Sequence, residues 1–309
     1  MNLRFVEAYY WVVTLKSVTR AAEKLHLTQS AMSSRVAALE QELGTLLLDR
    51  RDRQFRVTVA GMRFYAHAGK LLALHREIKA EMGGGASQPV TLRVGAIESV
   101  VHSWLIDWVR QTRVRHPALA LELTVETSPV LVDQLQRGTL DLVLAATAAA
   151  GNEVCSQALP LMDMVFTGHA AQHRKRRYTL AELADFDLLT FQRGSQPHLA
   201  LLDLMRRSGV EPRRVHSISS ISAMAQLVEE GLGVATLPKA VVLQLARRMP
   251  LRSLSADQTL PPLPIHLSWR DDPGSVPQRT LVDSVFESLG LAQTKVRPQA
   301  RPPSKKSMS

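Results

Sequence analysis

The sequence of 309 residues predicts a mainly helical N-terminal module that ends in a long helix, followed by an α/β body made of two subdomains. Three observations predict this division. Residues 83–89 form a Gly-rich stretch closed by a proline. Apolar residues recur with helical spacing before this stretch, whereas short apolar runs alternate with amphipathic segments after it. Charge also divides the chain, since residues 1–82 hold 13 Lys or Arg against 8 Asp or Glu, and residues 83–290 hold 20 against 20.

The composition excludes several classes of protein. Hydrophobic residues make up 45% and charged residues 21%, as in an ordinary globular chain. The only cysteine, Cys155, has no partner for an intrachain disulfide, which favours a reducing, cytoplasmic setting. The longest run of apolar or small residues, 142–151, is far shorter than the roughly 20 residues that cross a bilayer, so we expect no membrane contact. The basic N-terminal module favours a polyanionic partner, with a merely solvated basic surface as the alternative.

Three helices are predicted at the start of the chain. Apolar residues at helical spacing predict a first helix that ends near residue 16, and a second, short helix spans residues 18–25. Thr28 is the expected N-cap of a third helix over residues 29–43, because its hydroxyl can accept a free backbone amide. A short helix, a tight turn and a helix with a free polar face form a helix-turn-helix, whose second helix can lie in a major groove of DNA.

The polar face of the third helix carries the side chains expected to contact DNA. Gln can pair with adenine, Arg with guanine, and Ser with several base edges or phosphates. Many helical pairs share this spacing without touching DNA, which is the alternative interpretation. The candidate residues are Thr28, Gln29, Ser30, Ser33, Ser34 and Arg35.

A basic wing is predicted directly after this helix. The apolar run 46–48 and the segment 55–58 read as two short strands joined by an Arg-rich connection. Arginines in such a loop neutralise phosphates or enter a minor groove, which adds salt-dependent affinity without sequence information. The candidates are Arg50, Arg51, Arg53 and Arg56.

These segments resemble the LysR-type transcriptional regulators. The resemblance rests on SVTRAAEKLHLTQSAMS at 17–33, LEQELG at 39–44, LLDR at 47–50 and VTVAG at 57–61. The family often has Arg at the position of Ser34 and a polar residue such as Gln at the position of Arg35, so either residue could make the base or phosphate contact. Val18 stands where an aromatic residue is usual.

The helix predicted over residues 59–82 carries apolar residues spaced 4, 3, 4, 3 and 4 apart, which is a heptad pattern. At 24 residues it would be about 36 Å long, which is more than the small N-terminal module needs. Pairing with a second copy is therefore favoured over packing within the module, and the linker helix of the resembled family pairs in this way. The expected dimer seam is Phe64, Ala68, Leu71, His75, Ile78 and Met82.

The body repeats a pattern of strand, helix and strand, which predicts parallel sheets with right-handed crossovers. The chain is expected to pass between two subdomains near residues 160–163 and again near 263–267, leaving a cleft. The predicted strands are 90–96, 119–127, 140–146, 164–169, 188–192, 214–219, 234–237 and 264–269. The predicted helices are 99–115, 130–137, 198–208, 222–230 and 276–289, with a capping box at Thr179 and Glu182.

Ligands of open α/β sheets bind beyond the carboxyl ends of the strands, where helix N-termini present amides to anions. The resemblance implies that a small effector touches the position of Ser99. Arg193 would favour a carboxylate and Glu98 an amine or guanidinium, so the charge of the ligand stays open. A cap or loop role without ligand is the alternative for each candidate. The candidates are Ser99, Val100, Ser128, Thr147, Thr190, Gln192 and Arg193.

No catalytic, metal or dinucleotide site is predicted. His169 and His173 lack a third ligand nearby, and the pair Gly231 and Gly233 lacks a third glycine and a following helix. We therefore expect a ligand-responsive regulator that is not an enzyme and has no cofactor besides its effector. The alternatives are a ligand-independent architectural DNA-binding oligomer and a cytosolic enzyme that uses the cleft.

The residue pattern and the resemblance together lead to an expected fold, expected partners and expected boundaries for the whole chain. The fold is a winged helix-turn-helix with a linker helix, followed by an effector domain of the kind found in periplasmic binding proteins. The partners are double-stranded DNA with a two-fold symmetric operator, further copies of the chain as a dimer or dimer of dimers, and RNA polymerase. The expected parts are the DNA-binding domain 1–58, linker helix 59–82, flexible hinge 83–89, effector domain 90–293 and disordered basic tail 294–309.

Overall fold

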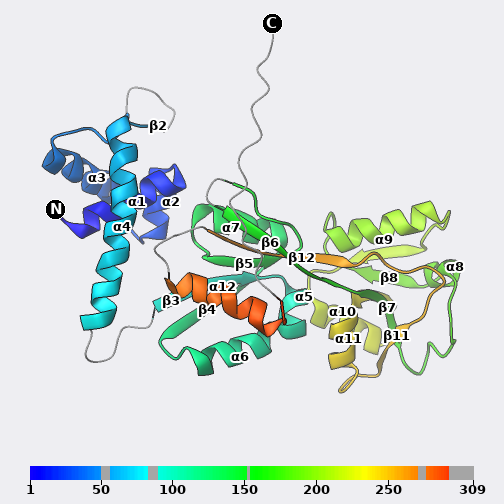
Figure 1. The fold of residues 1–309 in the computed structure, drawn as a ribbon. Helices are drawn as coiled ribbons and strands as arrows, with labels where there is room; N and C mark the ends of the chain where they lie inside the picture. Colours follow the sequence, from blue (N-terminus) through cyan, green and yellow to red (C-terminus); the bar gives the residue numbers. More distant parts are fainter. Residues whose placement is uncertain (50–55, 83–89, 152–153, 271–275, 292–309) are drawn as a thin grey trace, which may run out of the picture.

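The computed structural model describes residues 1–49, 56–82, 90–151, 154–270 and 276–291 (Figure 1). The expected hinge at 83–89 and tail at 294–309 lie outside these ranges, as do Arg50, Arg51 and Arg53 of the wing. The described residues form a helical N-terminal module beside two α/β subdomains that follow one another along the molecule.

The N-terminal module packs three helices and a two-stranded wing against the long helix. Polar side chains cap three of its helices, because Asn2, Ser17 and Thr28 each accept a backbone amide from the first turn that follows. Fully buried side chains such as Tyr9 and Leu39 fill the core. The predicted helices are confirmed within about a residue at each end. The elements are α1 Leu3–Leu15, α2 Val18–Lys24, α3 Gln29–Leu43, β1 Leu48–Asp49, β2 Arg56–Val57 and α4 Val59–Met82.

The first strand of the wing begins later than predicted. A strand was expected over residues 46–48, but among the described residues the ladder pairs Leu48 with Val57 and Asp49 with Arg56. The buried carboxylate of Glu40 in α3 accepts the backbone N–H of Leu47 at 2.8 Å and of Leu48 at 3.0 Å. The segment before β1 is therefore held on one side by α3 and on the other by Thr58, the residue after β2, whose N–H donates to the carbonyl oxygen of Leu47 at 3.0 Å.

The first subdomain is a five-stranded sheet with the order β4-β3-β5-β12-β6. As predicted, β3 is parallel to β4 and to β5. Two antiparallel strands, β12 and β6, extend the sheet. On one face α6 packs beside α12, where Trp108 donates to the Ser284 hydroxyl at 3.0 Å. The elements are β3 Val90–Ala96, α5 Glu98–Val100, the π-helix Val101–Leu105, α6 Ile106–Arg115, β4 Leu119–Val125, α7 Ser128–Arg137, β5 Leu142–Ala145, β6 Val154–Met162, β12 Leu263–Arg270 and α12 Val276–Ser288.

The second subdomain is a five-stranded sheet with the order β11-β7-β10-β8-β9. Its strand β10 is parallel to β8 and antiparallel to β7. The predicted capping box at Thr179 and Glu182 is confirmed at the start of α8. The elements are β7 Met164–His169, α8 Leu180–Ala184, β8 Asp187–Thr190, α9 Gln196–Arg207, β9 Arg214–Ser217, α10 Ile221–Glu229, β10 Val234–Pro238, α11 Lys239–Leu245 and β11 Leu251–Leu254.

The chain passes twice between the subdomains (Figure 1). The outward passage runs from β6 into β7 at Asp163, as predicted, and the return lies between β11 and β12, just before the predicted segment. Strand β6 was not predicted because Pro160 interrupts its sequence. It is an edge strand, and its register with β12 shifts beside Pro160, so the missing N–H costs no ladder hydrogen bond.

Among the residues that the structure describes, no helix combines the length and the apolar character needed to cross a membrane.

Candidate functional site

Helix α3 presents a continuous polar face. The Thr28 hydroxyl accepts the N–H of Ala31 at 3.2 Å and starts the helix. Met32 and Val36 are buried on the opposite face. The structure therefore gathers the predicted contact residues on one accessible helix face. Exposed are Thr28, Gln29, Ser30, Ser33 and Ser34, and Arg35 is half-buried.

The root of the wing is tightly packed against α3 and α4. Arg56 in β2 is exposed, and the other three candidate arginines lie outside the described residues. Gly61 in the first turn of α4 is buried, and a Cβ at this position would lie 2.2 Å from the carbonyl oxygen of Leu47. Burial, and next the Glu40 carboxylate, raise the pKa of Tyr9 far above its ordinary value, so its phenol stays neutral.

The predicted dimer seam is divided between two environments. Ala68 is buried, and the ring of Phe64 packs edge-on against the ring of Tyr9 with 5.5 Å between the ring centres. This part of the seam therefore packs in the core of the N-terminal module itself. Ile78 is 47% exposed, and the side chain of Met82 lies outside the described residues. Leu71 and His75 are half-buried.

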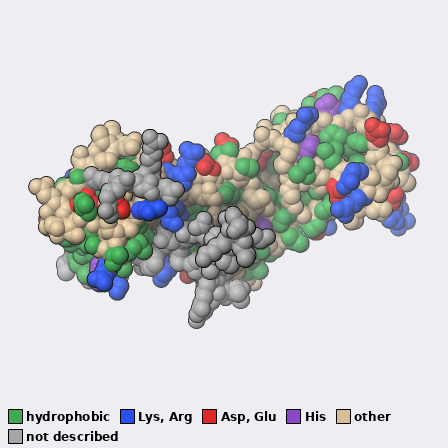
Figure 2. All heavy atoms as spheres, turned by 90° about the horizontal axis from the view of Figure 1, so that it is seen from above, with side chains coloured by type: hydrophobic (Ala, Val, Ile, Leu, Met, Phe, Trp, Pro, Cys, Tyr) green, Lys and Arg blue, Asp and Glu red, His purple; other side chains and the backbone are tan. Residues whose placement is uncertain are grey.

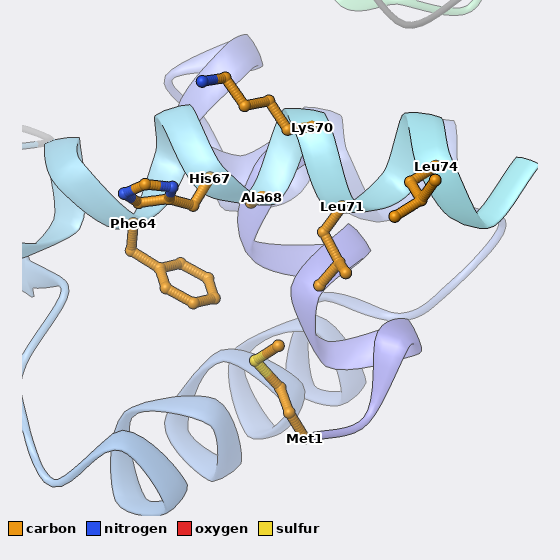
Figure 3. A pocket seen from close by; sticks show the side chains of 7 residues that line it. All are labelled: Met1, Phe64, His67, Ala68, Lys70, Leu71 and Leu74. Carbon is orange, nitrogen blue, oxygen red and sulfur yellow. The ribbon is translucent and has the colours of Figure 1, made fainter.

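An apolar groove of about 300 Å³ lies between the start of α1 and the middle of α4 (Figure 3). The side chains of Met1, Phe64 and Leu71 point toward one another across it, whereas Lys70 points away. Leu74, also in the lining, is 52% exposed. Sequence analysis missed Leu74, although 67, 71, 74 and 78 form a second heptad stripe beside the predicted one.

Glu98 connects the two subdomains. It opens the helix that follows β3, and its carboxylate accepts the N–H of Ile221 at 2.7 Å and the hydroxyl of Ser220 at 3.2 Å. Both partners belong to the N-terminus of α10 in the second subdomain. His102 Nε2 lies 3.5 Å from the same carboxylate. One side chain of the first subdomain thus occupies the amide-rich end of a helix in the second.

The hydrogen bonds to Glu98 keep it ionised. Burial alone would raise its pKa, but bonds from His102, Ile221 and Ser220 stabilise the anion and hold the pKa below its ordinary value. The N-terminus of α10 is therefore bound by a carboxylate that is ionised at neutral pH.

Some of the other predicted effector residues are buried or bound within the protein, and the rest are exposed. Ser128 accepts the N–H of Ala146 at 3.0 Å, and Thr190 is fully buried and accepts the hydroxyl of Thr236 at 2.8 Å. Ser99 is 3% exposed beside Glu98, and the side chain of Val100 is fully buried in the hydrophobic core. Thr147, Gln192 and Arg193 are exposed.

A second groove, of about 350 Å³, lies at the outward passage between the subdomains. Trp104, Pro160 and Leu243 are among its lining residues, and none of the predicted cleft residues lines it. The groove is thus separate from the residues predicted to bind an effector.

Charge is also unevenly distributed within the α/β body. Figure 2 shows Lys and Arg side chains gathered at the end of the body that lies far from the N-terminal module, with Asp and Glu side chains near them. Residues 174–177 contribute four exposed cations there, and Lys175 pairs with Glu182. The neutral total for the body therefore does not mean an uncharged surface.

Two family models match the chain. Residues 3–62 match the bacterial regulatory helix-turn-helix protein of the lysR family, and residues 86–290 match the LysR substrate binding domain. A probable hydrogen peroxide-inducible genes activator of Streptomyces viridosporus is 33% identical, with 72% of each chain covered. The HTH-type transcriptional regulator BenM of Acinetobacter baylyi is 25% identical, with 94% of this chain and 95% of BenM covered. A solved full-length OxyR variant of Pseudomonas aeruginosa shares the fold, with a TM-score of 0.61 at 23% identity over 98% of this chain and 99% of OxyR.

Proposed function

Because the chain belongs to the LysR family of DNA-binding transcriptional regulators, we propose that α3 reads a two-fold symmetric operator and that a small molecule bound between the subdomains controls the complex. The curated relatives named above are transcriptional regulators rather than enzymes. The observation that carries the proposal is the polar face of α3, whose predicted contact residues are exposed, except for the half-buried Arg35, while the opposite face is buried. A helix with this division can enter a major groove without losing its core packing.

The hydrogen bond of Ser34 within α3 supports different roles for Ser34 and Arg35. The Ser34 hydroxyl donates to the carbonyl oxygen of Ser30 at 2.9 Å, so its only proton is used inside the helix. Phosphates and the major-groove edge of guanine need donors. We therefore assign the donor contact to Arg35, whose guanidinium carries five N–H groups, and base reading to Gln29.

The wing and the linker helix complete the DNA-binding unit. Arg56, together with Arg50, Arg51 and Arg53 of the wing, supplies salt-dependent phosphate contacts. The apolar groove along α4 accommodates a second copy of the same helix, with Leu71, Leu74 and Ile78 at the contact. Such a two-fold dimer needs an operator with two-fold symmetry.

The remaining assignments extend this proposal. Two dimers assemble through the effector domains, the complex acts on RNA polymerase, and the protein works in the cytoplasm. The working units are a DNA-binding domain at 1–58, a linker helix at 59–82 and an effector domain at 90–293.

The effector binds beside Ser99, near the exposed Thr147, Gln192 and Arg193. It is a small organic molecule whose charge the arrangement leaves open, since the cleft holds both the Glu98 carboxylate and Arg193. The chain has one cysteine, Cys155, which is buried, so an intrachain disulfide cannot be the signal.

Selection of binding sites from random duplex DNA by the full-length protein tests the DNA-binding part. We expect one enriched sequence with two-fold symmetry, bound with an affinity that falls steeply with salt. Enrichment of no sequence, together with salt-dependent binding to all duplexes, would identify an architectural protein instead.

A further inference from the structure

The helix-turn-helix is docked on the first α/β subdomain through a partly buried ion pair. Lys24, the last residue of α2, places Nζ 2.7 Å from Oδ1 of Asp141, which directly precedes β5. The two side chains are only 11% and 18% exposed. Lys24 also lies 5.1 Å from the centre of the Trp11 ring, and the second oxygen of Asp141 accepts the N–H of Arg93 at 2.9 Å. Both charges are thus held by fixed neighbours, unlike those of an exposed surface pair.

A buried arginine joins the same two parts of the molecule. Arg270, 7% exposed at the end of β12, donates to the carbonyl oxygen of Thr14 at 3.2 Å and to that of Gln136 at 3.3 Å. These carbonyls lie in the last turns of α1 and α7, where helices leave acceptors unpaired and carry partial negative charge. One guanidinium therefore connects a helix end of the DNA-binding module with a helix end of the effector domain.

Close packing surrounds these polar contacts. Gly138 ends α7 in the left-handed conformation, and a Cβ there would lie 3.1 Å from the Leu15 side chain. Arg93 Nη2 lies 3.2 Å from Nε2 of His26. Among the described residues, Lys16 and His26 are the non-glycine residues with positive φ. Lys16 ends α1 and His26 lies in the turn after α2, and both of these segments face the contact. Such backbone persists where surrounding structure holds it in place.

The strands that carry the contacts also lead to the cleft. Asp141 directly precedes β5, and the far end of this strand, at Ala145, lies about 13 Å away at roughly 3.3 Å per residue. Beyond it Ala146 is bound by Ser128, and Thr147 is exposed. Arg93 lies in β3, five residues before Glu98. Three neighbouring strands, β3, β5 and β12, thus join the docking contact to the candidate effector site.

We propose that Lys24, Asp141, Arg93, His26 and Arg270 form an interdomain latch that fixes the orientation of the helix-turn-helix relative to the effector domain. The latch leaves the polar face of α3 exposed, so it does not block DNA. It sets the direction in which α3 points, and a shift of β3 and β5 at the cleft moves the module as a body. This inference rests on the proposed function only for its link to DNA geometry, because the docking itself is independent of the ligand and operator.

Carbodiimide coupling of the native full-length protein tests the docking directly. This zero-length reagent joins an amine to a carboxylate that is in contact with it, and mass spectrometry of the peptides locates the bond. We expect a Lys24–Asp141 link within one chain, shown by mixing ¹⁵N-labelled with unlabelled protein. The exposed pair Lys175–Glu182 is the internal positive control. Coupling at Lys175–Glu182 without coupling at Lys24–Asp141, or coupling only between chains, would overturn the latch.

Substitutions test the link to DNA. Asp141→Asn removes the latch charge on the effector domain, far from the recognition face, and Lys24→Met removes its partner. On a duplex selected by the wild-type protein, we expect both variants to change the distance between fluorophores on the two DNA ends. Affinity for a single half-site should change less than about twofold, since α3 is untouched. Lys24→Asp combined with Asp141→Lys should restore the wild-type distance.

Asp133→Asn is the matched control, because it breaks an exposed pair with Arg137 at 2.7 Å on nearby α7. Unchanged DNA geometry in both latch variants, or an equal change in Asp133→Asn, would overturn the coupling. A wild-type protein that selects no DNA sequence would contradict the proposed function, while the carbodiimide result would still decide whether the latch exists.

Discussion

Replacement of Gly61 by alanine should weaken the N-terminal module through one steric conflict. The added Cβ would lie 2.2 Å from the carbonyl oxygen of Leu47, 2.6 Å from the hydroxyl of Tyr9 and 2.7 Å from Cγ1 of Val57. The nearest of these atoms is backbone at the root of the wing, so relief needs a shift of α4 or of the segment before β1. Overpacking of this kind costs about 1–3 kcal/mol.

Hydrogen exchange of the full-length protein, read by mass spectrometry on core peptides of α1 and α3, measures this loss in the module alone. Since about 1.4 kcal/mol corresponds to a tenfold change, these amides should exchange roughly 5 to 150 times faster by global opening of the module. Gly69→Ala is the control, because its Cβ would lie 3.4 Å from the Tyr10 ring, an ordinary contact. There alanine should stabilise the helix by up to about 1 kcal/mol. Equal exchange in Gly61→Ala and wild type would refute the packing argument.

Three further predictions concern the two binding regions. Gln29→Ala should lose about 1–3 kcal/mol of discrimination at one base pair of each half-site, seen as a relaxed position when site selection is repeated; an unchanged consensus would remove Gln29 from the base-reading set. Arg56→Ala should lower the affinity for all duplexes and reduce the slope of log affinity against log salt by about 0.9. Arg176→Ala, which removes an exposed cation of the effector domain, should leave affinity and slope unchanged. Fluorescence anisotropy measures both variants, and a slope for Arg56→Ala equal to that of the wild type would contradict the phosphate contact. The pKa of Glu98 is lowered in the folded state, so its ionised form contributes stability that is present above about pH 4.5 and lost as the pH falls through the folded-state pKa. The difference in unfolding free energy between wild type and Glu98→Gln should therefore become smaller between neutral pH and about pH 3. A difference that stays constant would argue against an ionised Glu98 bound to α10.

Local signals made the N-terminal module predictable. Thr28, the apolar spacing of the third helix and Gly44 define α3 by capping and periodicity alone. The bounds of the wing strands were harder to predict from the sequence, because the Glu40 carboxylate that binds the N–H groups of Leu47 and Leu48 acts across a turn of the chain. A buried glutamate in an amphipathic helix gives no such signal in sequence.

The α/β body shows the same limit more strongly. The parallel pairs of β3 with β4 and β5, and of β8 with β9 and β10, were predicted correctly. The expected parallel arrangement was wrong for β7 and β12, which are antiparallel to their neighbours, and β6, α11 and β11 were not predicted. The four residues of β11 are too few to show a period, and Val241 and Val242 in α11 also suit a strand. The cleft candidates Ser128 and Thr190 have partners within the protein that only the packed sheets bring near.

Contacts between distant parts of the chain could not be predicted at all. Lys24 and Asp141 are 117 residues apart, and neither lies in a motif that indicates the other. Glu98 was predicted only as a partner for an amine or guanidinium of the ligand, although its carboxylate binds the N-terminus of α10. Both pairings depend on how finished units dock, which helical or strand periodicity does not encode.

The most direct test of ligand control is the unfolding temperature of the effector domain in the full-length protein, followed by calorimetry against pooled carboxylic acids, amines, amino acids and aromatic compounds. A true effector at 100 times its dissociation constant should stabilise the domain by roughly 2.7 kcal/mol. The account predicts a saturable rise with at least one compound, abolished by Ser99→Trp, which adds bulk directly beside Glu98. No rise with any class, or a rise that Ser99→Trp leaves intact, would contradict an effector site beside Ser99.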